Sequence, residues 1–280
     1  MAPDGVFFDA VGKLMSPWMG TELMGPLLYQ MIRSLRPVSV LEVGMGYTTP
    51  FLAKALDDNV KDFHREKEQL FSKTRRLMQQ NEGRPASGGT SEAWFVENPP
   101  LCNPSFYAGD HDPRLHAIDN LSSPRSSARA VIECIELLGL MGRINVQDGD
   151  FRGCSRKIDA KHMPFDFAWF DCGGYHEYRD FLDEYWEHIS NNGGILILHL
   201  TLSSVGINSI VKDLKLKQAT THFGDFELIS MLEPHKVHQS SFTMIRKISE
   251  FRETYADLRP DFVDTTLQEA CDLVNSAEAQ

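Results

Sequence analysis

The sequence predicts an α/β protein built on a doubly wound, mostly parallel β-sheet. Short β-branched and apolar runs alternate along the chain with segments of helical periodicity. The unbroken apolar run at 195–198 is typical of a parallel strand that is covered on both faces. Two further runs, Phe226–Leu232 and Ser241–Lys247, are joined by a segment too short for a crossover, which requires antiparallel pairing. These observations together predict a doubly wound sheet with an antiparallel edge.

Composition narrows the class of protein. The chain has 280 residues, enough for one large domain with additions, and its 24% charged and 42% hydrophobic residues are typical of soluble globular proteins. A formal net charge of −11 argues against a broad nucleic-acid interface, which needs a basic face. No apolar stretch approaches the roughly 18 residues of a membrane span, and the first residues lack the pattern of a signal peptide. The five cysteines show no Cys-x-x-Cys spacing. We therefore expect a cytoplasmic protein with no membrane or nucleic-acid partner.

A glycine turn follows the first predicted strand, at 38–43. Gly44 and Gly46 leave room for a ligand to approach the backbone and permit positive φ angles. Pro50 suits the first turn of the helix that follows, predicted to about residue 56. Glu42 lies at the end of the strand, where we expect its carboxylate to face the ligand crevice. The segment thus predicts a ligand-binding strand–turn–helix unit.

The organisation along the chain predicts additions to the sheet. Residues 1–37 are predicted to be a helical cap or substrate segment, and 38–249 the ligand-binding domain. Within that domain, residues 57–113 interrupt the alternation with an amphipathic helix to about residue 80, a loop and an aromatic connector. We interpret 57–113 as an insertion that forms a lid or a dimer arm, and we expect a homodimer. Residues 250–280 are predicted to be a helical tail.

Polar side chains stand at the predicted C-terminal ends of successive strands, where doubly wound sheets bind ligands. Asp119 follows a strand at 115–119, and its carboxylate is suited to accept both hydroxyls of a ribose. It lies far beyond the usual spacing of about 20 residues from the glycine turn, and the insertion explains that distance. The full set of strand-end residues is Glu42, Asp119, Asp150, Asp171 and His199.

The pattern hydrophobic-Glu-hydrophobic-Gly-x-Gly around Glu42, followed by acids at later strand ends, resembles class I S-adenosyl-L-methionine (SAM) methyltransferases. A dinucleotide-binding fingerprint is the alternative, but Thr49 stands where its third glycine belongs. The resemblance covers about residues 19–247 with the insertion outside it. It implies a Rossmann-like methyltransferase fold with a seven-stranded sheet and an antiparallel C-terminal strand, and SAM as the cofactor with S-adenosyl-L-homocysteine as its product.

The resemblance also implies roles for residues. Asp150 would accept a hydrogen bond from the adenine amino group and Phe151 would pack on the ring, although Asp148 competes with Asp150 for that role. Asp171 would lie beside the methionine part of SAM and the methyl acceptor. The predicted cofactor-binding set is Glu42, Gly44, Gly46, Tyr47, Thr48, Asp119, Asn120, Asp150, Phe151 and Asp171.

Histidines near the predicted site are candidates for the general base. His199 ends the most apolar strand, and a neutral imidazole with a pKa of about 6.5 suits proton removal from a hydroxyl or ammonium group. His176, in the loop after Asp171, is its rival, and His111 in the insertion is a weaker candidate. The predicted catalytic set is therefore His199, Asp171 and His176.

The resemblance extends to the catechol O-methyltransferase branch through Gly20-Thr21-Glu22 and Gly193-Gly194. Metal-dependent members of that branch hold a divalent cation with an Asp after the fourth strand and an Asp-Asn pair after the fifth. His199-Leu200 stands in the place of the pair here. We therefore predict no metal site and no required magnesium, with a transition metal near Asp171 and His199 left open.

These patterns lead to a functional hypothesis. The chain is expected to move a methyl group from SAM to an oxygen or nitrogen of a small molecule, in natural-product or specialised metabolism. The alternatives are a SAM-binding enzyme of other chemistry such as cyclisation, an NAD(P)-dependent oxidoreductase, and a non-catalytic assembly or regulatory protein with the same fold.

Overall fold

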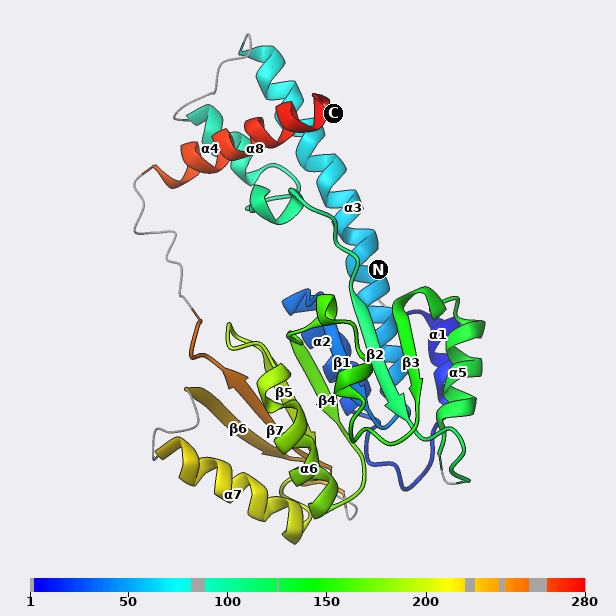
Figure 1. The fold of residues 1–280 in the computed structure, drawn as a ribbon. Helices are drawn as coiled ribbons and strands as arrows, with labels where there is room; N and C mark the ends of the chain where they lie inside the picture. Colours follow the sequence, from blue (N-terminus) through cyan, green and yellow to red (C-terminus); the bar gives the residue numbers. More distant parts are fainter. Residues whose placement is uncertain are drawn as a thin grey trace. The chain divides into compact units, whose positions relative to one another are not determined.

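A computed structural model describes residues 3–81, 89–124, 126–219, 225–236, 240–251 and 261–279. The chain divides into two compact units, Met1–Asp58 with Pro113–Arg252, and Asn59–Asp112 with Glu253–Gln280. The first unit contains a seven-stranded sheet of order β3-β2-β1-β4-β5-β7-β6 (Figure 1). Its strands are β1 (Ser39–Val43), β2 (Arg114–Asp119), β3 (Ile144–Asp148), β4 (Phe167–Phe170), β5 (Ile195–His199), β6 (Phe226–Leu232) and β7 (Ser241–Lys247).

The sheet is parallel from β3 to β5, and β7 runs antiparallel to both of its neighbours, β5 and β6. This confirms the predicted doubly wound, mostly parallel sheet with an antiparallel C-terminal strand. The register sets the site. Val43 is opposite both Ile118 and Phe170, so β1, β2 and β4 end at one level. The residues that follow them therefore meet at one edge of the sheet.

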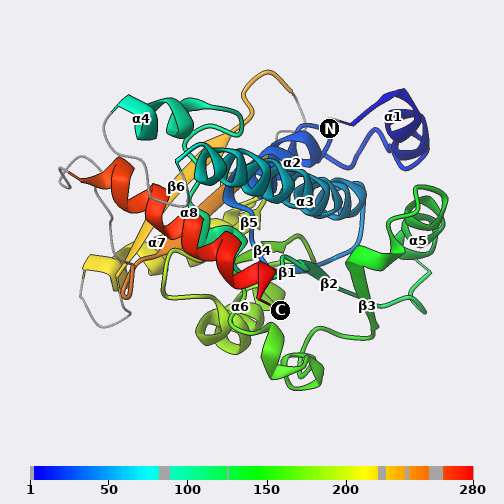
Figure 2. The same cartoon turned by 90° about the horizontal axis from the view of Figure 1, so that it is seen from above.

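Two hydrophobic layers cover the sheet, and β4 shows how one strand serves both. Phe167 and Trp169 pack with α1 (Gly5–Gly12), α2 (Met24–Leu35), the start of α3 (Thr49–Gln80) and α5 (Ala128–Leu137). Ala168 and Phe170 pack on the opposite face with α6 (Tyr175–Tyr185) and α7 (Val205–Ala219). Figure 2 shows α2 and α6 on opposite sides of the strands. Because side chains alternate along a strand, an unbroken apolar run such as β5 satisfies both layers.

The second unit joins the insertion to the C-terminal tail, which the sequence analysis did not predict. The later part of α3, α4 (Gly89–Val96), a short 3₁₀ helix (Pro104–Tyr107) and α8 (Phe262–Glu278) share one apolar cluster that includes Leu70, Trp94 and Leu267. The predicted helix boundary at residue 57 is wrong. α3 continues from the glycine turn through that point to Gln80. Its residues 49–56 pack on the sheet, whereas Phe63, Leu70 and Leu77 carry a second apolar stripe seven residues apart.

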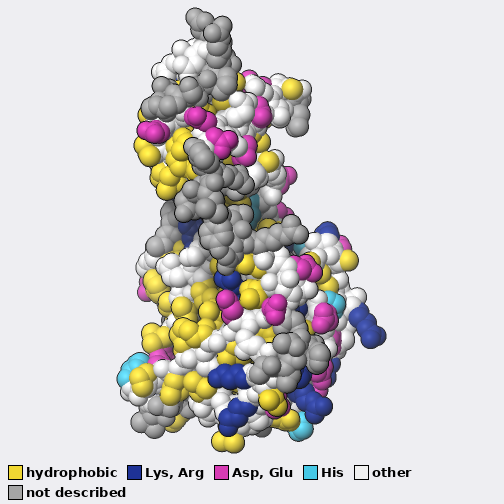
Figure 3. Space-filling model, turned by 90° about the vertical axis from the view of Figure 1, so that its left-hand side faces the viewer, with side chains coloured by type: hydrophobic (Ala, Val, Ile, Leu, Met, Phe, Trp, Pro, Cys, Tyr) yellow, Lys and Arg dark blue, Asp and Glu magenta, His cyan; other side chains and the backbone are white. Residues whose placement is uncertain are grey.

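The surface at the β6 edge carries apolar side chains. Ile229, Met231 and Leu232 are each more than 40% exposed. Figure 3, seen from the side on which β6 lies in Figure 1, shows hydrophobic side chains gathered on this face of the molecule. No described helix is long and apolar enough to cross a membrane.

Candidate functional site

A cavity of about 670 Å³ opens at the edge of the sheet where β1, β2, β3 and β4 end. This volume falls within the range of about 300–1,000 Å³ that is usual for small-ligand sites. Its wall comes from the segment before α2, the glycine turn and the loops after three further strands. The lining residues are Leu14, Ser16, Met19, Thr21, Val43, Gly44, Met45, Gly46, Tyr47, Thr48, Ile118, Asp119, Asn120, Ser123, Ser126, Ser127, Gly149, Asp150, Phe151, Arg152, Asp171, Cys172, Gly173 and Glu177.

The glycine turn is in close contact with the loop after β4. Gly44 has a φ angle of +93°, and a Cβ atom placed there would lie 2.2 Å from the backbone oxygen of Asp171. The Asp171 amide donates to the carbonyl of Val43 at 3.0 Å, which holds the two segments together. At Gly46 an added Cβ would meet no protein atom closer than the Ser127 hydroxyl at 4.0 Å. Gly44 is thus required for packing within the protein, whereas Gly46 keeps a stretch of the cavity wall open.

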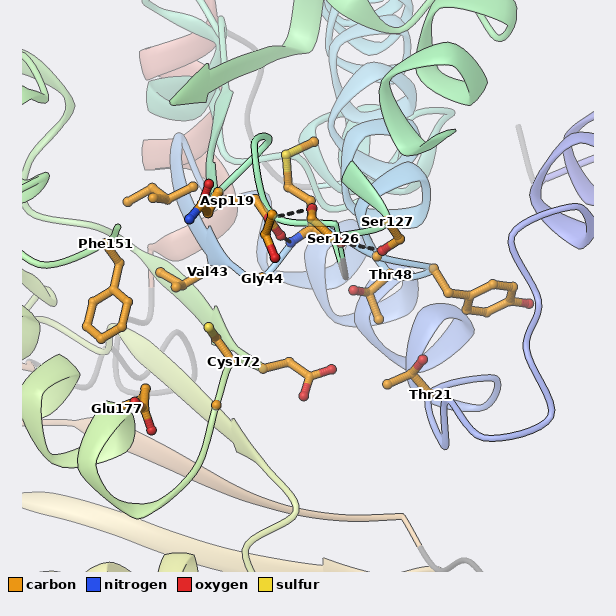
Figure 4. A pocket seen from close by; sticks show the side chains of 18 of the residues that line it. Thr21, Val43, Gly44, Thr48, Asp119, Ser126, Ser127, Phe151, Cys172 and Glu177 are labelled. Carbon is orange, nitrogen blue, oxygen red and sulfur yellow. Dashed lines mark hydrogen bonds between the residues drawn. The ribbon is translucent and has the colours of Figure 1, made fainter. Parts of the chain in front are cut away.

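Asp119 connects the second strand to the glycine turn. Its carboxylate accepts the Met45 amide at 2.8 Å and the Ser126 hydroxyl at 2.6 Å. The Ser127 hydroxyl donates to the Met45 carbonyl at 2.9 Å, so both polar backbone groups of Met45 are held. Figure 4 shows Asp119, Ser126 and Ser127 on one side of the cavity, and Phe151, Cys172 and Glu177 on the other. The predicted ribose-binding acid therefore lies in the cavity wall in a fixed orientation.

The loop after β3 distinguishes the two competing acids. Asp148 accepts the Leu121 amide at 2.9 Å and does not line the cavity, whereas Asp150 does. Phe151 is buried beside it, and Arg152 binds the Asp150 carboxylate at 3.0 Å. The geometry favours Asp150 for a ligand contact, with Asp148 holding the neighbouring loop.

Glu42 lies beneath the glycine turn and not in the cavity wall, which corrects the expectation that its carboxylate faces the ligand. Alternation along β1 turns Val43 toward the cavity and Glu42 into the protein, where it is fully buried. One carboxylate oxygen accepts the Thr48 hydroxyl at 2.8 Å. Burial raises the pKa of Glu42 to about 8, against the lowering effect of hydrogen bonds from Thr48 and Thr49. Glu42 thus stabilises the glycine turn from inside the protein, through its hydrogen bond with Thr48.

Asp171 and His199 form a hydrogen-bonded pair in which only the histidine is buried. His199 Nδ1 lies 2.7 Å from Asp171 Oδ1, and its Nε2 lies 3.0 Å from the Ser240 hydroxyl. A neutral imidazole satisfies both contacts if Nδ1–H donates to Asp171 and Nε2 accepts from Ser240. His199 is 1% exposed and does not line the cavity, whereas Asp171 does. The expectation of His199 as a base in contact with the acceptor is therefore corrected. It sits behind the carboxylate that faces the cavity.

The two rival histidines lie elsewhere. His176 is the second residue of α6, is exposed to solvent and is absent from the cavity lining. His111 is buried within the second unit. The described residues contain no group of three or more His, Cys, Asp or Glu side chains arranged to hold a metal ion.

The cavity is strongly acidic. Its described lining includes the carboxylates of Asp119, Asp150, Asp171 and Glu177, against the single guanidinium of Arg152. The Cys172 thiol lies close to this negative charge. Burial, and then these same four carboxylates, raise its pKa to about 11. Such a wall favours a ligand that carries positive charge.

Several lining residues were missed from the sequence. Ser126 and Ser127 precede α5, and a pair of hydroxyls before a helix is an ordinary capping signal, which hid their contacts to Asp119 and Met45. Glu177 accepts the Gly174 amide at 2.8 Å, a contact that the spacing of three residues at a helix start would have predicted. Leu14, Ser16, Met19 and Thr21 also line the cavity, although the sequence analysis placed them only in a helical cap or substrate segment.

Comparisons with known proteins show the fold. No protein-family model and no curated protein matches the sequence. Solved structures that match include the O-methyltransferase TomG of Streptomyces achromogenes, involved in tomaymycin synthesis and crystallised with SAM (TM-score 0.56, 14% identity, covering 88% of this chain and 91% of that one). Others are an O-methyltransferase of Bacillus cereus bound to S-adenosyl-homocysteine (TM-score 0.54, 14% identity, 88% and 92%) and the methyltransferase PaMTH1 of Podospora anserina, also bound to that product (TM-score 0.50, 13% identity, 87% and 88%). The chain thus has the fold of class I O-methyltransferases, as the resemblance of its sequence implied.

Proposed function

We propose that the protein is a SAM-dependent methyltransferase that acts on an oxygen or nitrogen of a small, uncharged or amine-bearing molecule. The observation that carries the proposal is the acidic cavity at the strand ends, walled by the glycine turn and by Asp119. The fold and the SAM or S-adenosyl-homocysteine bound to its structural neighbours support the same conclusion.

The cavity fits SAM in charge and in the order of its contacts. Gly46 leaves room for a ligand against the backbone, and Asp119 offers carboxylate oxygens to the ribose hydroxyls. Asp150 and Phe151 would hold the adenine, and Asp171 lies beside the turn. The four lining carboxylates attract the sulfonium and ammonium charges of SAM. When bound, SAM would supply a methyl group on a positively charged sulfur, and attack of an in-line nucleophile on the methyl carbon would release that sulfur as a neutral thioether.

The acceptor class follows from the same charges. Among the described residues that line the cavity, Arg152 alone carries a cationic side chain, and three carboxylates already bind it. A phosphorylated or carboxylated acceptor would therefore meet repulsion in this cavity. A phenol, alcohol or amine meets Asp171, whose carboxylate can accept the hydrogen bond of the nucleophile and favour its proton loss. Alignment of the two reactants supplies much of the remaining acceleration.

His199 would act on this step through Asp171, as a positioning residue. His199→Ala is expected to lower kcat about tenfold with little change in the KM for SAM, because Asp171 loses the donor that fixes it. His199→Asn, whose amide can replace Nδ1–H, should recover most of the rate. His176→Ala is the matched control and should leave both constants unchanged, since His176 lies outside the cavity. Steady-state kinetics of all three variants check this, and an unchanged kcat in His199→Ala would remove His199 from the reaction.

Calorimetric titration with S-adenosyl-homocysteine and with NADH tests the function itself. We expect S-adenosyl-homocysteine to bind and NADH not to bind. Methyl transfer from labelled SAM onto a panel of phenols, alcohols and amines should then identify the acceptor class. Folded protein that binds neither SAM nor its product would contradict the proposal. Binding without transfer to any acceptor would favour the non-catalytic alternative. The role in specialised metabolism and the homodimer stay predictions.

A further inference from the structure

Arg152 lines the cavity and binds carboxylates from two elements. Its Nη1 lies 3.0 Å from Asp150 Oδ2, and its Nε lies 2.7 Å from Asp180 Oδ2. Its Nη2 lies 3.5 Å from Glu177 Oε1. The guanidinium carbon is 4.8 Å from the centre of the Phe151 ring. One side chain therefore ties the loop after β3 to the first turns of α6.

These ion pairs contribute little to the stability of the fold, but they orient the Asp150 carboxylate. The Asp150, Glu177 and Asp180 side chains are 35–58% exposed, and exposed ion pairs of this kind stabilise a fold only weakly. Asp150, however, receives both Nη1 and the backbone amide of Arg152, the latter at 2.9 Å. The amide contact, to Oδ1, belongs to the backbone, so the side chain of Arg152 is what holds the second oxygen, Oδ2. Arg152 thus holds Asp150 in one orientation at the cavity wall.

We propose that Arg152 is a positioning residue that makes the cavity select a 6-aminopurine over a 6-oxopurine. The inference rests on the proposed function and concerns the base of the cofactor. A fixed Asp150 carboxylate only accepts hydrogen bonds, so it pairs with the amino group of adenine and repels the carbonyl of hypoxanthine. If the Arg152 side chain is replaced, Asp150 keeps only the backbone amide contact, so Oδ2 can turn toward water and both the attraction and the repulsion weaken.

The test compares two ligands, S-adenosyl-homocysteine and S-inosyl-homocysteine, which differ at this position of the purine. The variants are Arg152→Gln, Arg152→Lys and the matched control Arg156→Gln, which removes an exposed arginine four residues further along the chain and outside the cavity. Calorimetry should show that Arg152→Gln weakens the adenosyl ligand roughly tenfold, the scale of one charged hydrogen bond, while changing the inosyl ligand less than about twofold. Arg152→Lys keeps the charge but lacks the planar guanidinium that binds several carboxylate oxygens at once, so its affinity for the adenosyl ligand should lie between those of the wild type and Arg152→Gln. Arg156→Gln should match the wild type.

The outcomes separate the two levels of the proposal. Equal weakening of both ligands by Arg152→Gln would overturn the role in base selection, because it would show a general electrostatic or structural effect. Unchanged affinities of Arg152→Gln for both ligands would overturn that role as well. If the wild-type protein binds neither ligand, the proposed function itself fails and this inference fails with it. Circular dichroism of each variant confirms that folded protein is compared.

Discussion

Gly44→Ala is expected to abolish cofactor binding and to destabilise the fold by about 4 kcal/mol or more, in the range reserved for direct steric conflicts. The new Cβ would lie 2.2 Å from the Asp171 carbonyl oxygen, which is backbone and cannot swing aside as a side chain can. The φ angle of +93° adds a conformational cost that only glycine avoids. Relief requires that the loop after β4 move away from β1, which would also displace Asp171 from the cavity wall. Denaturant unfolding and calorimetric titration with S-adenosyl-homocysteine measure the two effects.

Gly139→Ala is the matched control. Gly139 also has a positive φ angle, +68°, but an added Cβ there meets no atom within 4 Å. It lies just after α5, where glycine commonly ends a helix. The substitution should therefore cost only about 1 kcal/mol, from the backbone angle alone, and leave ligand binding intact. If the two variants lost similar stability, the close approach of Gly44 to Asp171 would not be the cause.

The fold was predictable because its signals are local. The buried run of β5 and the hairpin of β6 and β7 follow from patterns within a few residues, and both appear at the predicted positions. The joining of the insertion to the tail was not predictable, because Leu70 and Leu267 lie nearly two hundred residues apart and each belongs to an ordinary amphipathic helix. Periodicity shows that a helix has an apolar face but not which partner covers it.

The site was predictable to the level of strand ends but not of side-chain direction. Asp119, Asp150 and Asp171 line the cavity because parallel strands of matched register end together. Glu42 and His199 stand at strand ends as well, yet both turn into the protein. A shift of one residue reverses the face of a strand, so the position of a residue at a strand end does not fix where its side chain points. Arg152 and Ser126 were missed because their contacts depend on loops that carry no periodic pattern.

Asp119→Asn is expected to weaken S-adenosyl-homocysteine binding by about 30- to 100-fold. The carboxylate holds the Met45 amide and the Ser126 hydroxyl at once, and an asparagine has only one acceptor oxygen for these two donors. The charge offered to the ribose hydroxyls is lost as well. Two weakened charge-assisted hydrogen bonds correspond to about 2–3 kcal/mol, which gives the stated range. Calorimetric titration measures the affinity.

Asp148→Asn is the control for Asp119→Asn. Asp148 is opposite Asp119 in the register of β2 and β3, carries the same charge and also ends its strand, but it lies outside the cavity. A loss of affinity caused merely by a lower negative field would appear in both variants, whereas a contact made by Asp119 itself would appear in one. Ser126→Ala completes the comparison. It removes one support of the Asp119 carboxylate and keeps the charge, so its affinity should lie between those of the wild type and Asp119→Asn. An affinity for Ser126→Ala equal to that of the wild type would mean that the charge of Asp119 matters and its orientation by Ser126 does not.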